Sequence, residues 1–163
     1  SGWMHNGTHV VDTLTFLLDD VIEVEQITGM IESPYQNDPT LEVVATLKRR
    51  RAPVVISAID EALYQIFELD FWFENARLRL EDFCERVILE RRIVNAIGEC
   101  VLENSPTGLL GRSNVPMENA VGLIGEYLDS GDTTQLAGCC LEDIRPTMET
   151  LWEGRRLYEK TRS

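Results

Sequence analysis

Hydrophobic and polar residues alternate with a period of two along the middle of the chain. In residues 41–47 and 67–73 the odd-numbered positions are all apolar, and in residues 76–81 apolar residues alternate with charged ones. Side chains of a β-strand point alternately to its two faces, so this pattern predicts strands that bury one face. Further strands are predicted at residues 21–31, 54–59 and 87–93. The short connections between these segments favour antiparallel pairing.

A period near that of an α-helix replaces the alternation at both ends of the chain and predicts three helices. The first covers residues 8–18, the second starts at Pro116 and stops at Ser130-Gly131, and the third covers residues 140–160. The residues expected to face inward are Val10, Leu14, Leu17 and Leu18 in the first helix, Met117, Ala120, Val121, Ile124 and Leu128 in the second, and Leu141, Ile144, Met148, Leu151 and Tyr158 in the third.

This order of elements predicts an α+β fold in which an open-faced, mostly antiparallel (mixed) β-sheet is covered on one face by helices. The length suits a single domain over residues 1–163. Val44, Val55, Ile66 and Trp72 fall on the polar side of their strands. A second copy of the chain that covers the sheet would explain them, and scattered exposed apolar residues are the alternative.

Charge and cysteine content narrow the possible partners and the location. With 15 basic and 28 acidic residues, the net charge of −13 repels phosphate backbones and anionic membranes, so we expect no nucleic-acid or membrane partner. No apolar run reaches the roughly 20 residues that cross a bilayer, and the chain opens with no secretory signal pattern. The four cysteines show no C-x-x-C spacing. Reduced thiols and a cytoplasmic location are therefore expected.

Both histidines of the chain, His5 and His9, lie close to Asp12. If all three residues are helical, their spacing places them on one face. Three interpretations stay open at this point. The group could ligate a divalent metal, although no Glu stands between the histidines as it does in H-E-x-x-H. One histidine could instead transfer protons near neutral pH, or both could be structural residues near the start of a helix.

Residues 7–14, G-T-H-V-V-D-T-L, resemble the G-x-H-x-x-D-x-L segment that opens the main helix in the second domain of the Gfo/Idh/MocA family of oxidoreductases. Other segments resemble the family in the same order along nearly the whole chain. They are R-L-R-L-E-D at 77–82, P-M-E-N-A at 116–120, Y-L-D-S-G-D at 127–132 and D-I-R-P-T-M-E at 143–149.

The resemblance implies a domain that binds a sugar or sugar-nucleotide substrate and forms homo-oligomers through its open sheet. In this family NAD or NADP is bound mainly by an N-terminal Rossmann domain, whose G-x-G-x-x-G motif is absent from this chain, as is the family's E-K-P segment with its catalytic lysine. We therefore expect the substrate-binding and oligomerisation domain of a larger NAD(P)-dependent oxidoreductase, inactive by itself. The alternative is a non-catalytic carbohydrate-binding or scaffold dimer.

Carried over by motif, His9 is the catalytic residue that contacts the reacting hydroxyl and helps to move its proton. His5, Asn6 and Asp12 are assigned to substrate binding, and no metal is assigned. Many family members have Asp where this chain has His5. Asn6 is equally suited to be a helix cap, as is Thr8, and Asp12 is expected mainly to fix the start of the helix. The basic cluster 49–51 is expected to be a solvated turn, with contact to a substrate phosphate as the alternative.

Overall fold

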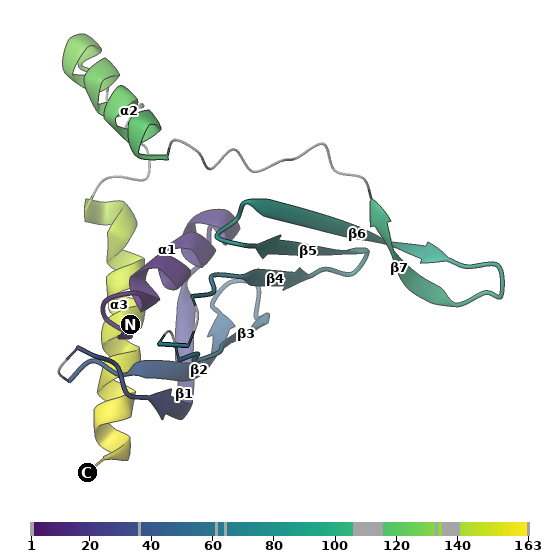
Figure 1. The fold of residues 1–163 in the computed structure, drawn as a ribbon, viewed down its shortest axis with the longest axis horizontal. Helices are drawn as coiled ribbons and strands as arrows, with labels where there is room; N and C mark the ends of the chain where they lie inside the picture. The colour runs from purple at the N-terminus through teal and green to yellow at the C-terminus, as the bar shows by residue number, and fades with distance from the viewer. Residues whose placement is uncertain are drawn as a thin grey trace. The chain divides into compact units, whose positions relative to one another are not determined.

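The computed structural model describes residues 2–35, 37–60, 62–63, 65–105, 116–132, 134 and 141–162, without the side chains of 116–120. The described part of the chain contains three helices and two antiparallel sheets, which confirms the α+β class (Figure 1). It divides into two compact units. The first combines Ser1–Tyr64 with Glu126–Ser163, and the second is Gln65–Gly125. The prediction of one domain remains a prediction.

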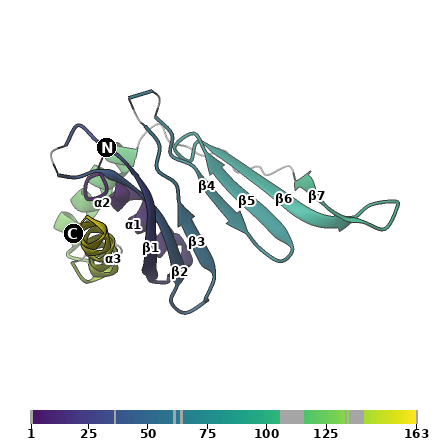
Figure 2. The same cartoon turned by 90° about the horizontal axis from the view of Figure 1, so that it is seen from below.

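The first unit contains a sheet of three antiparallel strands in the order β1-β2-β3. They are β1 (Ile22–Ile31), β2 (Thr40–Leu47) and β3 (Pro53–Ile56). The alternation along β2 has the predicted result, because Leu41, Val43, Ala45 and Leu47 are all buried. Helices α1 (Gly7–Leu18) and α3 (Leu141–Thr161) lie on the same side of this sheet (Figure 2). Helix α3 packs on β1, and α1 packs on α3.

The faces that α1 and α3 bury agree only in part with the predicted faces, since Leu14 and Leu151 are buried as predicted. In α1, Val11 and Leu14 are buried, while Leu17 is 49% exposed. The buried residues of α3 are Thr147, Thr150, Leu151 and Gly154, whereas Leu141 and Ile144 are exposed. Small and polar residues can line this contact because their hydrogen bonds are satisfied locally; the Thr150 hydroxyl donates to the Ile22 carbonyl at 2.8 Å.

The turn between β2 and β3 is tied to the end of α1 through Asp20. This carboxylate is fully buried and accepts hydrogen bonds from the backbone N–H groups of Val21, Arg49 and Arg50 at 2.9, 3.0 and 3.1 Å. Desolvation raises the pKa of Asp20, but these bonds and the one from the Arg50 side chain outweigh it and lower the pKa to about 2. Arg49 also pairs with Asp19.

The arginines of the basic cluster 49–51 thus form ion pairs with acidic residues of the same chain. Arg51 pairs with Glu23 at 3.5 Å, while Arg49 and Arg50 bind the two aspartates that follow α1. The prediction of a solvated turn is confirmed, because all three arginines are exposed, but it did not include these ion pairs. Its alternative, a phosphate contact, would have to compete with these ion pairs.

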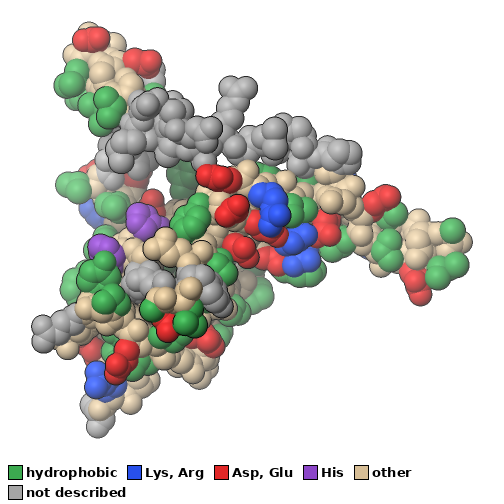
Figure 3. Space-filling view, viewed as in Figure 1, with side chains coloured by type: hydrophobic (Ala, Val, Ile, Leu, Met, Phe, Trp, Pro, Cys, Tyr) green, Lys and Arg blue, Asp and Glu red, His purple; other side chains and the backbone are tan. Residues whose placement is uncertain are grey.

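The second unit contains a sheet of four antiparallel strands in the order β4-β5-β6-β7. They are β4 (Leu69–Trp72), β5 (Ala76–Glu81), β6 (Arg86–Val94) and β7 (Cys100–Ser105). The register places Leu78 opposite Phe71 and Leu89 on one face. On the other face Arg77 pairs with Asp70 and Glu90, and basic and acidic side chains lie side by side over this sheet (Figure 3).

The strands form two separately hydrogen-bonded sheets instead of the single sheet expected from sequence. Every pairing among the described strands is antiparallel, and β3 has a ladder only with β2. Pro53, at the start of β3, has no N–H to donate and suits a strand at a sheet edge. Strand β7 was not predicted, because Glu103, Asn104 and Ser105 break the apolar pattern.

Helix α2 (Pro116–Ser130) begins at the predicted proline and is followed by Gly131 with a φ of 69°. Its stripe of Val121, Ile124 and Leu128 was expected to face inward but is exposed by 50–73%. Met117 and Ala120 of the same predicted stripe lie outside the described side chains. Among the described residues, no helix has the length and apolar character needed to cross a membrane.

Candidate functional site

The segment that precedes α1 is anchored by Trp3, which is only 3% exposed. Its indole Nε1 donates to the Leu151 carbonyl of α3 at 2.8 Å, and its backbone N–H donates to the Pro39 carbonyl at 2.8 Å. The ring lies where Cβ atoms on Gly7 and Gly154 would approach it to 3.0 and 2.8 Å. Two glycines without side chains therefore leave the space that the indole fills.

Asp38, in the connection between β1 and β2, holds Met4 and His5, the two residues that follow Trp3 in the sequence. Its two carboxylate oxygens accept hydrogen bonds from the backbone N–H groups of Met4 at 2.8 Å and His5 at 3.2 Å. The connection is itself closed by Ser33, whose hydroxyl donates to the Asp38 carbonyl. The backbone that carries His5 is thus fixed from two sides, by α3 through Trp3 and by this loop.

His5 lies in the turn that precedes α1 and is not part of the helix, since α1 begins at Gly7. The condition for a shared helical face of His5, His9 and Asp12 is therefore not met. The exposed ring of His5 lies against that of Tyr35, with centroids 4.5 Å apart and planes tilted by 38°. This contact turns His5 toward the β1–β2 connection.

Asn6 stands at the N-cap position of α1, but its side chain makes no capping hydrogen bond. Its φ of −94° and ψ of −20° are helical, whereas a capping residue usually has extended dihedrals. The Thr8 hydroxyl donates to the His5 carbonyl at 2.6 Å and does not cap either. The expected cap is therefore wrong, and the Gly2 carbonyl instead accepts from the N–H groups of Asn6 and Gly7.

His9 lies in the first turn of α1 with an exposed side chain. Figure 3 shows both histidines at the surface of the same face of the molecule. The backbone of His9 is held within the helix: its N–H donates to Asn6, and its carbonyl accepts from the Thr13 hydroxyl at 2.6 Å. No hydrogen bond joins its imidazole to another residue of the described chain. The imidazole therefore presents its nitrogens to solvent.

Asp12 links the two helices of the first unit. Its Oδ1 accepts a hydrogen bond from the buried hydroxyl of Thr147 in α3 at 3.0 Å, and Thr147 also lies 3.2 Å from the Thr15 hydroxyl. The carboxylate thus satisfies a buried polar group at the contact of α1 with α3. The expectation that Asp12 is structural agrees with this contact, but the contact lies along the helix and not at its start.

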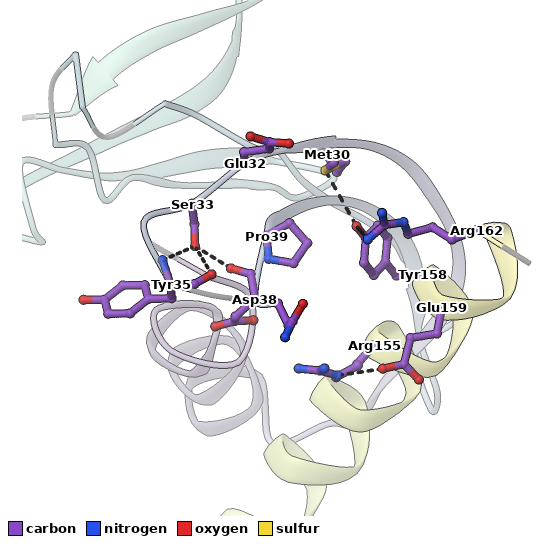
Figure 4. Close-up of a pocket in the computed structure, with 11 residues that line it drawn as sticks. Met30, Glu32, Ser33, Tyr35, Asp38, Pro39, Arg155, Tyr158, Glu159 and Arg162 are labelled. Carbon is purple, nitrogen blue, oxygen red and sulfur yellow. Dashed lines mark hydrogen bonds and ion pairs between the residues drawn. The ribbon is translucent and has the colours of Figure 1, made fainter.

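An open depression of about 730 Å³ lies beside this segment (Figure 4). One wall is the β1–β2 connection, including Tyr35 and Asp38, and the other is the last two turns of α3. Arg155, Tyr158 and Glu159 of α3 line it, together with Arg162, which follows the helix. Tyr35 contacts both His5 and the depression, whereas His9 does not line it. In the sequence, the four lining residues along 155–162 stand at positions i, i+3, i+4 and i+7, a spacing that places side chains on one face of a helix. This spacing was the signal from which the wall could have been found.

The metal interpretation of the two histidines finds no support in the arrangement of side chains. Across the described residues, no group of three or more histidines, cysteines and acids could hold an ion. Cys84 and Cys100 are free thiols; burial raises the pKa of Cys84, while Cys100 is exposed and accepts from Arg92 at 3.1 Å. Cys139 and Cys140 lie outside the described residues.

Comparison of this chain with protein-family models, with curated proteins and with solved structures finds no match.

Proposed function

We propose that this chain is the substrate-binding and oligomerisation domain of an NAD(P)-dependent oxidoreductase of the Gfo/Idh/MocA type, acting on a sugar or sugar-nucleotide in the cytoplasm. The observation that supports this most is the division of roles between two residues of the G-T-H-V-V-D segment. The His9 imidazole is exposed, while Asp12 one turn on is bound to Thr147. His9 can therefore meet a substrate, whereas Asp12 keeps its helix in place.

The chemistry proposed for His9 is the acceptance of a proton from a substrate hydroxyl. A histidine imidazole carries a ring nitrogen whose lone pair can accept such a proton. General-base catalysis by a positioned side chain contributes about 10²–10⁴-fold in rate. The His9 backbone is held within α1 by its hydrogen bonds with the Asn6 carbonyl and the Thr13 hydroxyl, which gives the side chain a fixed base.

The described residues do not fit a dinucleotide by themselves. A dinucleotide is held at the turn between a strand and a helix in a unit of parallel strands. All pairs among the described strands are antiparallel. We therefore assign NAD or NADP to a separate domain and expect no nicotinamide-dependent turnover from this chain alone.

The test of this function is turnover by the complete gene product, with NAD⁺ or NADP⁺ and D-glucose, myo-inositol or UDP-glucose as probes. We expect His9→Gln to lower kcat about 10²–10⁴-fold. Its melting temperature should stay unchanged, because the imidazole supports no other described residue. Glu149→Gln, at an exposed position of α3, serves as the control. Turnover by the isolated chain, or full activity of His9→Gln, would contradict the proposal.

Homo-oligomerisation through an open sheet face is the second part of the proposal. On the charged face of the second sheet, Trp72 is 68% exposed and the Arg77 guanidinium lies 4.1 Å from its ring centroid. A large aromatic ring beside arginine is a combination that protein interfaces favour. The same feature would suit the alternative function, a non-catalytic carbohydrate-binding or scaffold dimer.

We expect light scattering after size-exclusion chromatography to give the mass of a dimer or larger oligomer for the wild-type chain. Trp72→Asp should shift the mass toward that of a monomer, because a carboxylate would be desolvated at the interface. Trp152→Asp is the matched control, since Trp152 is 58% exposed on α3 of the first unit. A monomeric wild-type chain, or equal effects of the two variants, would argue against this surface.

A further inference from the structure

The depression beside α3 has a wall that is already built before any ligand is present. In the β1–β2 connection, the Tyr35 N–H donates to the Ser33 hydroxyl at 3.1 Å, and the Asp38 N–H donates to the Tyr35 carbonyl at 3.2 Å. The Asp38 carboxylate is engaged by the N-terminal segment at the same time. Because these bonds hold the loop, a ligand would not have to order it on binding.

The opposite wall presents hydrogen-bonding groups from the last turns of α3 and from Arg162 just after it (Figure 4). Arg155 Nε donates to Glu159 Oε1 at 2.9 Å, and Arg162 Nη1 donates to the Tyr158 hydroxyl at 3.2 Å. These bonds use one N–H of each guanidinium, which has five. The Arg162 guanidinium also lies 5.7 Å from the ring centroid of Tyr158. The wall therefore combines fixed donors and acceptors with an aromatic ring.

The charges of the lining groups favour a neutral ligand over an anion. The carboxylates of Glu32, Asp38 and Glu159 outnumber the guanidinium groups of Arg155 and Arg162. Arg155 is already paired with Glu159, and the net charge of the chain is −13. A phosphate or a free carboxylate would meet this acidic surrounding and compete with an existing ion pair.

We propose that this depression is a binding site for a neutral carbohydrate. Each sugar hydroxyl donates and accepts hydrogen bonds at once, so it needs donors and acceptors side by side, as the guanidinium and carboxylate groups provide here. The ring of Tyr158 offers apolar surface to the C–H face of a sugar, whereas the Tyr35 side chain points away from the depression (Figure 4). The volume of about 730 Å³ lies within the range of small-molecule sites.

The test is a calorimetric titration of the chain alone with maltose, cellobiose and glucose 6-phosphate, without any cofactor. We expect saturable binding of a neutral disaccharide, weakened about tenfold or more by Arg155→Gln through loss of charge-assisted hydrogen bonds. Arg156→Gln is the matched control, because the neighbouring Arg156 pairs with Glu153 and does not line the depression. Circular dichroism of each variant checks that it is folded.

Tyr158→Phe provides a second variant that keeps the ring and removes only the hydroxyl, so we expect a smaller loss than with Tyr158→Ala. The proposal is overturned if neither disaccharide binds the folded chain, if glucose 6-phosphate binds more tightly, or if Arg156→Gln weakens binding as much as Arg155→Gln. Because the readout is binding without turnover, this result is independent of the activity proposed for His9.

Discussion

We expect Trp3→Ala to lower the free energy of unfolding of the first unit by about 3–5 kcal/mol, as is usual when a buried aromatic side chain is removed. The indole is 3% exposed, fills the space between Gly7 and Gly154, and donates to the Leu151 carbonyl. Its loss leaves a cavity between helices and an acceptor without its donor. Urea unfolding followed by circular dichroism measures the change.

Gly154→Ala tests the same contact from the other side. An alanine Cβ would lie 2.8–2.9 Å from the Trp3 ring, which is rigid and cannot bend away. Overpacking of this kind costs about 1–3 kcal/mol. In a Trp3→Ala background the same methyl group would enter the cavity, so the cost should vanish. The double-mutant cycle therefore has a large coupling free energy.

Gly122→Ala is the control for this cycle, because a Cβ there meets nothing within 4 Å. Alanine is the better helix former, and we expect a neutral or slightly stabilising effect of up to about 1 kcal/mol. An equal cost of Gly154→Ala with and without the indole would show that the helical backbone, and not Trp3, requires glycine at this position.

The second large effect is expected for Asp20→Asn, which should lower the melting temperature at neutral pH by several degrees. An amide has only one oxygen to accept the bonds that both carboxylate oxygens accept from Val21, Arg49 and Arg50. It also removes the negative charge that faces the Arg50 guanidinium. The turn between β2 and β3 would lose its attachment to the end of α1.

The pH dependence of this effect follows from the lowered pKa of Asp20, about 2 in the folded chain against about 3.9 in an unfolded one. A carboxylate with a lowered pKa adds stability above pH 4, and this stability is lost as the pH falls through 2. The difference between wild type and Asp20→Asn should therefore shrink in that window. Melting curves between pH 7 and pH 2 measure it.

Asp19→Asn is a closely matched control for Asp20→Asn. The two residues are adjacent and both face Arg49, but the Asp19 side chain is 94% exposed and that of Asp20 is fully buried. Exposed ion pairs contribute little to stability, and asparagine tolerates the φ of 45° at this position. A loss of stability as large as that of Asp20→Asn would refute the role assigned to burial.

Period-two patterns were the most reliable signals in the sequence. The predicted segments at 41–47 and 76–81 became β2 and β5 almost residue for residue, because alternation reflects a single requirement, one buried and one solvated face. The division into two sheets could not be foreseen in this way. It depends on which strand edges pair, and strand edges consist of backbone groups that every residue except proline shares.

The helical stripes predicted where helices lie, but only part of the face that each one buries: Leu14 and Leu151 are buried as predicted. Leu141 and Ile144 looked like core residues and are exposed, while Thr147 and Gly154 are buried. Their burial depends on partners distant in sequence: Asp12 accepts from Thr147, and Trp3 occupies the space beside Gly154. A hydrophobicity pattern contains no information about such partners.

The candidate site, too, was predicted only in part from the sequence. The histidines and Asp12 were identified from residue type and spacing, and the structure finds the His9 side chain exposed in the first turn of α1. The structure also separates the histidines and Asp12 from one another, because α1 begins after His5 and the Asp12 side chain turns to α3. The depression between the β1–β2 connection and α3 was not predicted, since its walls are more than 100 residues apart in sequence.

The amino-acid sequence by itself determined the α+β class, the extents of the helices and most strands, and the residues at which chemistry is proposed, because these depend on periodicity and residue type within short segments. Only the tertiary structure decided that the strands form two sheets, that Trp3 requires glycine on both sides, and that Asp20 holds the basic turn. Each of these depends on which distant groups meet, and burial then decides how strongly they interact.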